Sequence, residues 1–183
     1  MSHRNEFEAV ALIHLDSVYR TALALCGKKE TAEDLVQTTF VKAFGNFGSF
    51  KKGTNCRAWL IRILRNSWFD YLRQQRFRAK EIPLDEDLAE GKSSPDETTW
   101  TNARDLLENF SDEQIIKALS RIPDEQRLAV YLVDVEGLSH EEVAGIMEIA
   151  VGTVKSRTSR ARATLKRILA SYAKEMRLPG AEK

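Results

Sequence analysis

Cysteine and histidine are both scarce in this 183-residue chain, and each shortage argues against a class of protein. Its two cysteines, Cys26 and Cys56, are too few for a disulfide framework and are typical of a reducing compartment. The three histidines are far apart, and none stands at metal-ligand spacing from a cysteine, so we expect no metal or cofactor. The chain has no glycine-rich phosphate loop and no nucleophile-elbow motif, which predicts that it is not an enzyme.

Long apolar runs are also absent. No stretch of 18 consecutive apolar residues occurs, so no membrane insertion is expected. Acidic residues interrupt the first sixteen residues, which do not have the pattern of a signal peptide. These features together predict a cytoplasmic protein.

The formal net charge of +1 hides an uneven distribution along the chain. Residues 57–76 contain five arginines and one acid, whereas residues 81–113 contain eleven acids and two bases. Residues 152–167 contain six bases and no acid. A solvated helix face usually mixes both signs, so two basic blocks around an acidic stretch predict two nucleic-acid-binding surfaces on one chain.

Hydrophobic periodicity predicts an all-α fold of two small helical domains joined by an acidic flexible linker. The expected boundaries are 1–79, 80–111 and 112–183, with a short helix at 100–110 inside the linker. The first helix should span about 6–26 and bury Ile13, and Gly27 should end it. Thr31, with Asp34 three residues on, predicts the start of a second helix. The apolar face of that helix is Leu35, Val36, Phe40, Val41, Ala43 and Phe44.

The third expected helix, about 57–76, has two contrasting faces. One is an apolar stripe made of Leu60, Ile63, Leu64, Ser67 and Tyr71. The opposite face collects Arg62, Arg65, Asn66, Phe69, Arg73 and Arg76. Guanidinium groups can neutralise phosphates, and an amide or an exposed aromatic ring can hold an unpaired base. This face therefore predicts contact with single-stranded DNA.

The C-terminal run LSHEEVAGIMEIAVGTVKSRTSRARATLKR predicts a helix-turn-helix. Ser139 and Glu142 form a capping box that opens a short helix, and a turn follows at about 148–150. The second helix should bury Val151, Val154, Thr158, Ala161, Leu165 and Ile168. Its remaining faces should contact duplex DNA through Thr153, Lys155, Ser156, Arg157, Ser159, Arg160, Arg162 and Arg167.

Four phrases resemble, in order, the motifs of bacterial extracytoplasmic-function (ECF) sigma factors: AEDLVQTTFVKAF, RAWLIRILRNSWFDYLRQQR, IPDEQRLAVYLVDVEGLSHEEVAGIM and VGTVKSRTSRARATLKR. The resemblance covers nearly the whole chain. It implies a region 2 domain to about residue 78 and a region 4 domain from about residue 112. Implied partners are promoter DNA, an anti-sigma factor, and the largest-subunit clamp helices and the flap of core RNA polymerase.

The resemblance also implies roles for individual residues. The second helix would dock on the clamp helices through Asp34, Gln37, Thr38 and Val41. The loop Phe50–Arg57, together with Asn66, would form a pocket for a flipped-out base of the minus-10 element, with Phe50, Asn55 and Arg57 as the loop residues that contact DNA. The helix from Gly152 would read the minus-35 element.

The run GSFKKGTNCRAWLIRILRNSW resembles the general-stress-response (EcfG-like) branch, whose antagonist is a small helical anti-sigma protein. Branches with zinc-binding anti-sigma factors are similar to it as well. Two other functions stay open at this point. The chain could be a helix-turn-helix activator that binds duplex DNA only, or a sigma mimic that titrates an anti-sigma factor.

Overall fold

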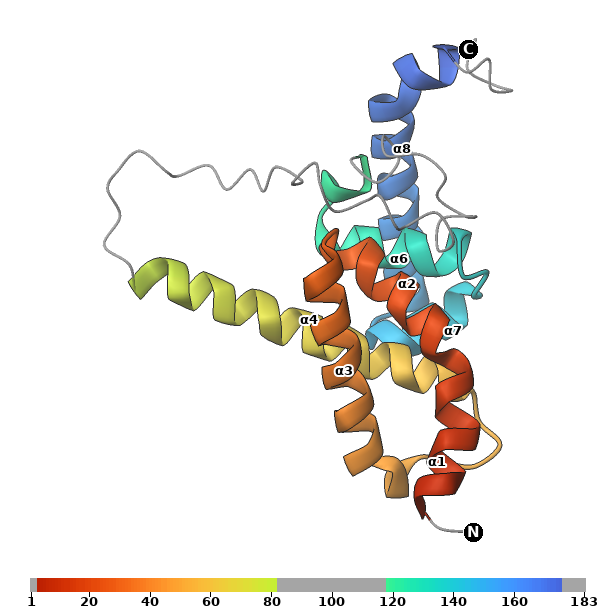
Figure 1. The fold of residues 1–183 in the computed structure, drawn as a ribbon. Helices are drawn as coiled ribbons and strands as arrows, with labels where there is room; N and C mark the ends of the chain where they lie inside the picture. Colours follow the sequence, from red (N-terminus) through yellow and green to blue (C-terminus); the bar gives the residue numbers. More distant parts are fainter. Residues whose placement is uncertain (1–2, 82–117, 176–183) are drawn as a thin grey trace. The chain divides into compact units, whose positions relative to one another are not determined.

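The computed structural model describes residues 3–81 and 118–175, and it is all-α, with no strand in these ranges (Figure 1). The chain divides into two compact units. The first comprises residues 1–22 and 28–99, and the second comprises residues 23–27 and 100–183. The expected linker beyond residue 81 and the expected helix at 100–110 lie outside the described residues.

Helices and short 3-10 turns make up the N-terminal part of the chain. The elements are α1 (His3–Ala11), η1 (Leu12–His14), α2 (Leu15–Cys26), α3 (Lys29–Gly45), η2 (Phe47–Ser49) and α4 (Cys56–Glu81). Gly27 ends α2 as expected, with φ at +69° and its N–H donated to the Leu23 carbonyl at 2.8 Å.

The expected first helix is not continuous, and the prediction that it buries Ile13 is wrong. The turn η1 separates α1 from α2 and shifts the phase of the buried stripe. Ile13 is consequently 73% exposed, and the core positions are taken by Phe7, Ala11 and Val18. A 3-10 helix has three residues per turn, whereas an α-helix has 3.6. A buried stripe predicted at α-helical spacing therefore falls on the wrong residues from the 3-10 turn onward.

The expected start of α3 is wrong, and its expected apolar face is confirmed only in part, since Leu35, Val36 and Ala43 are buried. The helix begins at Lys29, before Thr31, and no side chain caps it. Its buried stripe includes Thr39, whose hydroxyl donates to the Leu35 carbonyl at 2.7 Å. Because Thr39 can satisfy its hydroxyl within the helix, it occupies a core position that an apolar residue was expected to fill. Val41 and Phe44 are left 66% and 43% exposed.

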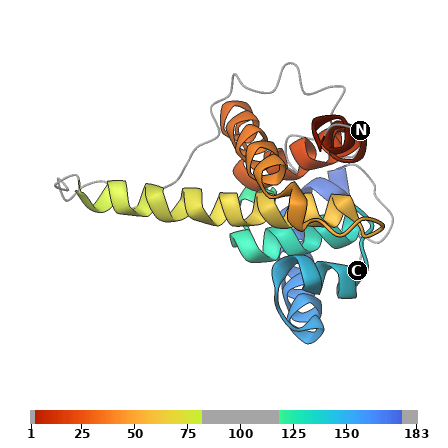
Figure 2. The same ribbon diagram turned by 90° about the horizontal axis from the view of Figure 1, so that it is seen from below.

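Helix α4 packs against α3, and its far end extends beyond the other helices of the first unit (Figure 2). Three residues of the expected stripe, Leu60, Leu64 and Ser67, are buried. Ile63 and Tyr71 are only half-buried, whereas Ile61 and Trp68 are buried, so the buried face is shifted from the expected one toward Ile61 and Trp68. This packing fixes which side of α4 remains exposed.

The stretch Arg4–Cys26 is, by length and composition alone, apolar enough to cross a membrane, which was not expected. Core helices of soluble proteins also meet this criterion, and Ala11, Val18 and Ala22 of the stretch are fully buried. The observation is therefore weak evidence for a membrane span.

The second unit holds the expected helix-turn-helix. Its described helices are α6 (Asp124–Asp134), α7 (His140–Met147) and α8 (Val151–Glu175). The capping box is confirmed, because Glu142 N–H donates to Ser139 Oγ at 3.2 Å and Ser139 N–H donates to Glu142 Oε2 at 2.9 Å. Glu148, at a left-handed φ of 55°, ends α7 at the expected turn.

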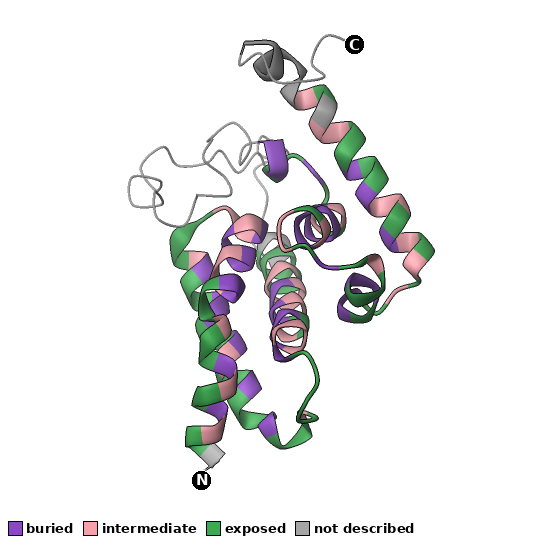
Figure 3. Cartoon of the chain, turned by 90° about the vertical axis from the view of Figure 1, so that its right-hand side faces the viewer, coloured by how far each residue is buried: buried purple, intermediate pink, exposed green. Residues whose placement is uncertain are grey.

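Burial along α8 follows the expected helical period (Figure 3). Val154, Thr158 and Ala161 are buried, and Val151 and Leu165 are half-buried on the same side. The Thr158 hydroxyl donates to the Val154 carbonyl at 2.9 Å, which satisfies the one polar group of this stripe. The opposite side of α8 is exposed.

Candidate nucleic-acid interface

The exposed face of α4 brings together most of the polar residues expected there. Arg62, Asn66 and Arg76 are exposed, and Arg65 is half-buried. The Arg65 guanidinium donates to Asn66 Oδ1 at 3.1 Å and lies 5.5 Å from the centre of the Phe69 ring. Phe69 is half-buried rather than fully exposed as expected, because it packs under this guanidinium. The group forms a small platform with an amide at its edge.

A second polar group joins α4 to α3, and sequence analysis did not find it. Lys42 of α3 donates from Nζ to Ser67 Oγ at 3.1 Å, and the same nitrogen lies 3.6 Å from Asp70 Oδ2. Asp70 also pairs with Arg73 three residues along α4. Asp70 is the one acid within residues 57–76. It therefore sits between two cations on the face expected to contact DNA.

The loop from residue 50 to residue 55 is held by its own backbone and side chains. Thr54 donates to the Lys51 carbonyl through both its N–H, at 3.2 Å, and its hydroxyl, at 2.7 Å. Gly53 has φ at +82°, a conformation that favours glycine. Asn55 Oδ1 accepts from the Ala58 N–H at 3.0 Å, so Asn55 caps the start of α4. The loop also presents exposed Lys51 and Lys52, which lie within the expected pocket loop but were not named as contact residues.

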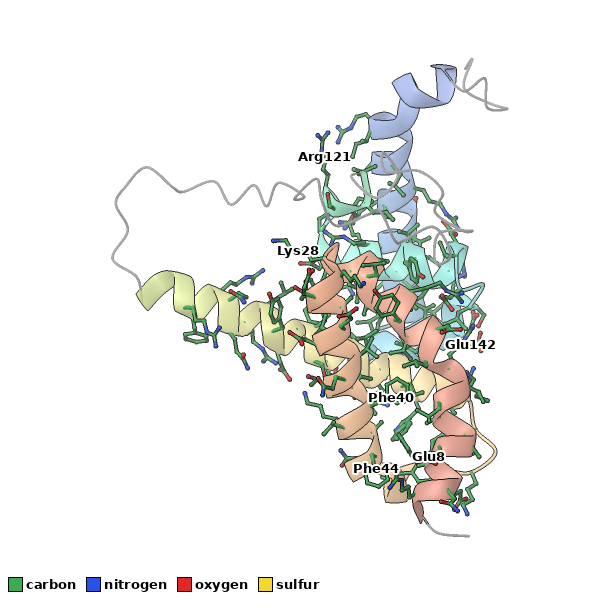
Figure 4. The ribbon with its side chains drawn as sticks, in the orientation of Figure 1. Glu8, Lys28, Phe40, Phe44, Arg121 and Glu142 are labelled. Carbon is green, nitrogen blue, oxygen red and sulfur yellow. The ribbon has the colours of Figure 1, made fainter. Side chains whose placement is uncertain are left out.

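An aromatic cluster supports this loop. Phe50 stacks on Phe47 with ring centres 5.8 Å apart, and the centre of the Trp59 ring lies 5.1 Å from that of Phe50. Phe47 meets Phe7 of α1 edge-on at 5.2 Å. Phe7 also meets Phe40 and Phe44, which point from α3 toward α1 (Figure 4). Phe50, the first residue of the loop, is half-buried in this cluster, so its ring anchors the start of the loop there.

The residues expected to dock a partner share one exposed face of α3. Asp34, Gln37, Thr38 and Val41 follow the i, i+3, i+4, i+7 pattern, and all four are exposed. Beside them, a cavity of about 190 Å³ opens between α3 and α4. Its lining includes Thr31, Asp34, Leu35, Thr38, Ser67, Tyr71 and Gln74. This face combines one acid, two neutral polar side chains and an exposed valine, which suits a protein partner.

The outer face of α8 has small residues at its centre and cations around them. Gly152, Ser159 and Ala163 are exposed, and Ser156 and Thr153 are half-buried. The surrounding exposed cations are Lys155, Arg160 and Arg167. Small side chains allow a helix backbone to approach the floor of a major groove, and the cations can reach bases or phosphates.

Two arginines expected to contact DNA are instead paired within the second unit. Arg157, with 20% of its side chain exposed, forms an ion pair with Glu125 of α6. Arg162 is held by both oxygens of Asp134, with Nε to Oδ2 at 3.0 Å and Nη2 to Oδ1 at 2.5 Å. The hydrogen bond to Asp134 raises the pKa of Arg162. Glu125 and Asp134 were missed because only the fold brings α6 beside α8.

Two pKa shifts in the first unit have simple causes. Partial burial, and then the charge of Arg57, lowers the pKa of His14. Arg57 is half-buried near the start of α4. Burial raises the pKa of the Cys56 thiol, which disfavours the reactive thiolate and indicates a packing role for that cysteine.

Both parts of the chain match known protein families. Residues 12–78 match the Sigma-70 region 2 family, and residues 112–165 match the Sigma-70, region 4 family. Two relatives are each 36% identical to this chain. They are ECF RNA polymerase sigma factor EcfG of Rhodopseudomonas palustris, over 86% of this chain and 82% of that protein, and sigma factor SigE of Mycolicibacterium smegmatis, over 88% of this chain and 61% of that protein.

Solved structures agree with these matches. Sigma factor RpoE of Bartonella quintana, in a co-crystal with the anti-sigma factor NepR, superposes with a TM-score of 0.70 at 32% identity, over 90% of this chain and 96% of that one. CnrH, solved with the cytosolic domain of CnrY, has a TM-score of 0.57 at 22% identity over 91% of this chain and 87% of that one, which supports the fold alone.

Region 2 followed by region 4 defines a sigma-70 type initiation factor. More narrowly, the chain belongs to the ECF RNA polymerase sigma factors. Sigma factors are transcription initiation factors rather than enzymes, and their regions 2 and 4 bind core RNA polymerase and promoter DNA.

Proposed function

We propose that this sigma factor recognises its promoters through two separate DNA surfaces. In the first, the 50–55 loop and the polar face of α4 capture an unpaired base of the minus-10 element. In the second, the outer face of α8 reads the minus-35 element as duplex. The exposed face of α3 docks on the clamp helices of polymerase, and the second unit reaches the flap.

The observation that carries this proposal is the arrangement around Asn66. Its Oδ1 accepts from Arg65, whose guanidinium covers Phe69, so the amide is oriented before any DNA arrives. An oriented amide beside an aromatic ring suits a base that has left the stack, because the amide can bond to the edge of the base while a ring stacks on its face. The arginines around it supply contacts to phosphates, which are independent of sequence.

Asn66→Ala tests the proposal in reconstituted holoenzyme. The variant should impair promoter melting and reduce base preference at one minus-10 position, while binding to core polymerase and to the minus-35 element stays intact. Permanganate footprinting of the melted region, with a pre-melted promoter as control, measures this. Gln75→Ala is a matched control, because Gln75 is an exposed amide on the opposite side of the same helix.

A variant that melts duplex promoters with unchanged base preference would contradict the role of this face. The same assay separates the alternative functions. A duplex-only activator would not open promoters with core polymerase, and a sigma mimic would not direct transcription at all.

We further propose that the chain works in the cytoplasm, has no catalytic activity of its own, and is held inactive by a small anti-sigma protein of the NepR type. The support is its similarity to EcfG and to RpoE, which was solved bound to NepR. Co-purification with a NepR-type protein, and loss of transcription when it is added, would agree with the EcfG-like branch. Inhibition only by a zinc-binding anti-sigma factor would instead place the chain in a different branch.

A further inference from the structure

Helix α1 lies outside the residues that match region 2, which begin at residue 12, yet it contacts the loop proposed to capture a base. Lys52, in the middle of that loop, forms an ion pair with Glu6 of α1. The next residue, Phe7, is 5% exposed and lies in the aromatic cluster on which Phe50 rests. Two consecutive residues of α1 thus reach the loop by two different routes.

The loop needs such contacts to have a fixed position. The Thr54 to Lys51 hydrogen bonds and the Asn55 cap set its internal shape. They do not connect its tip, at Lys52 and Gly53, to the body of the unit. The Glu6 pair supplies that connection, and the chain passes beside α1 at this point on its way to α4 (Figure 1).

We infer that Glu6 is a positioning residue for base selection: through Lys52 it holds the 50–55 loop against α1, which packs on α4, and it touches no DNA itself. This inference rests on the proposed function of the loop. The Lys52 side chain is 77% exposed and that of Glu6 is 32% exposed. Without the ion pair, the tip of the loop loses its contact with α1 and should change position. The fold should stay intact, because exposed ion pairs contribute little to stability.

Glu6→Gln in full-length holoenzyme tests the inference. The measured quantity is the ratio of open-complex formation on the preferred promoter to that on promoters with single minus-10 substitutions. We expect this ratio to fall by about 1.4- to fivefold, the range that exposed ion pairs contribute. Glu8→Gln is the matched control, because Glu8 lies on the same helix and pairs with Arg4, away from the loop. It should leave the ratio unchanged.

Lys52→Gln removes the other partner of the same ion pair. A substitution in this exposed loop will not unfold the unit. It should reduce the ratio as Glu6→Gln does, and the double variant should show no further loss. A uniform rise in affinity for all promoters in Glu6→Gln, with an unchanged ratio, would overturn the inference by showing a simple charge effect. Additive losses in the double variant would also overturn it.

Asn66→Ala, measured on the same promoters, separates this inference from the proposed function. If Asn66→Ala lowers base preference and Glu6→Gln does not, only the positioning role of Glu6 fails. If Asn66→Ala leaves base preference unchanged, the proposed base capture itself fails, and the positioning role fails with it.

Discussion

The arginines of the two basic helices, α4 and α8, pair with acidic residues that lie in different elements. On α4, the pairing acid is on the helix itself, where Asp70 lies between Arg73 and Lys42. On α8, the acids come from α6 and hold the flanking Arg157 and Arg162. The outer face of α8 is then left with small residues and exposed cations, whereas the outer face of α4 carries an amide and an aromatic ring.

This difference indicates how each helix meets DNA. A smooth face with paired arginines at its sides suits a duplex, because the helix can enter the groove as one rigid body. An amide held beside a guanidinium and an aromatic ring suits bases that leave the stack and come to the protein. Under the proposed function, two helices of similar net charge bind two forms of DNA, and the neighbouring groups determine which form each helix binds.

The largest effect that would sharpen this comparison is expected at Arg160. Arg160→Ala should weaken binding of the full chain to minus-35 duplex by about 1–3 kcal/mol if the side chain contacts a base in two places. Arg162→Ala, on the same helix, should cost less affinity, because Asp134 already holds that guanidinium. Fluorescence anisotropy with duplex probes that vary at one position measures both. Equal losses for the two variants would remove the distinction between outer and flanking cations.

A second test concerns the acids. Asp70→Asn should leave Lys42 and Arg73 without their shared partner, raise nonspecific affinity for single-stranded DNA, and steepen its dependence on salt by about one unit. Asp134→Asn should raise affinity for duplex instead, because it releases Arg162 on α8. Titrations of both variants with single-stranded and duplex probes at several salt concentrations distinguish the two. If both variants strengthened binding to the same probe, the comparison would not hold.

Local sequence signals predicted the parts of each surface that depend on one helix. The capping box at Ser139 and the core stripe through Leu64 both depend on residues a few positions apart; the first is confirmed, and the second is confirmed at Leu60, Leu64 and Ser67. The α3 stripe of Asp34 to Val41 was named from the family resemblance, and the structure leaves it exposed. Its role in docking remains a prediction.

The remaining features depend on contacts between distant residues. Glu125 and Asp134 lie about thirty residues before their arginine partners, and Phe7 lies about forty residues before Phe47, so no local pattern could pair them. The error at Ile13 had a different cause, since the 3-10 turn at Leu12–His14 changes the register of the buried stripe. Sequence periodicity describes a helix well and describes the break between two helices poorly.

A third prediction compares how α3 and α7 begin. Ser139→Ala should lower the free energy of unfolding of the second unit by about 1 kcal/mol, because it removes one half of a formed capping box. Thr31→Ala should cost less than about 0.5 kcal/mol, because α3 begins two residues earlier and has no side-chain cap. Urea denaturation followed by circular dichroism measures both. A larger loss at Thr31 than at Ser139 would contradict this account of the helix starts.

The smallest effect concerns pH and should be confined to the first unit. Burial and the charge of Arg57 lower the pKa of His14 in the folded chain, so the unfolded chain binds a proton on this side chain more readily. The stability that neutral His14 allows is present above its unfolded pKa of about 6.5 and is lost as the pH falls through the lower, folded value.

His14→Gln should change stability at pH 8 by about 0.5 kcal/mol or less and should reduce the loss on going to pH 5. Arg57→Gln should raise the pKa of His14 and reduce the same loss by a smaller amount, because burial is the larger cause. NMR titration of the His14 ring, alongside urea denaturation at pH 5 and pH 8, checks both variants, and a folded pKa above the unfolded one would reverse the predicted sign.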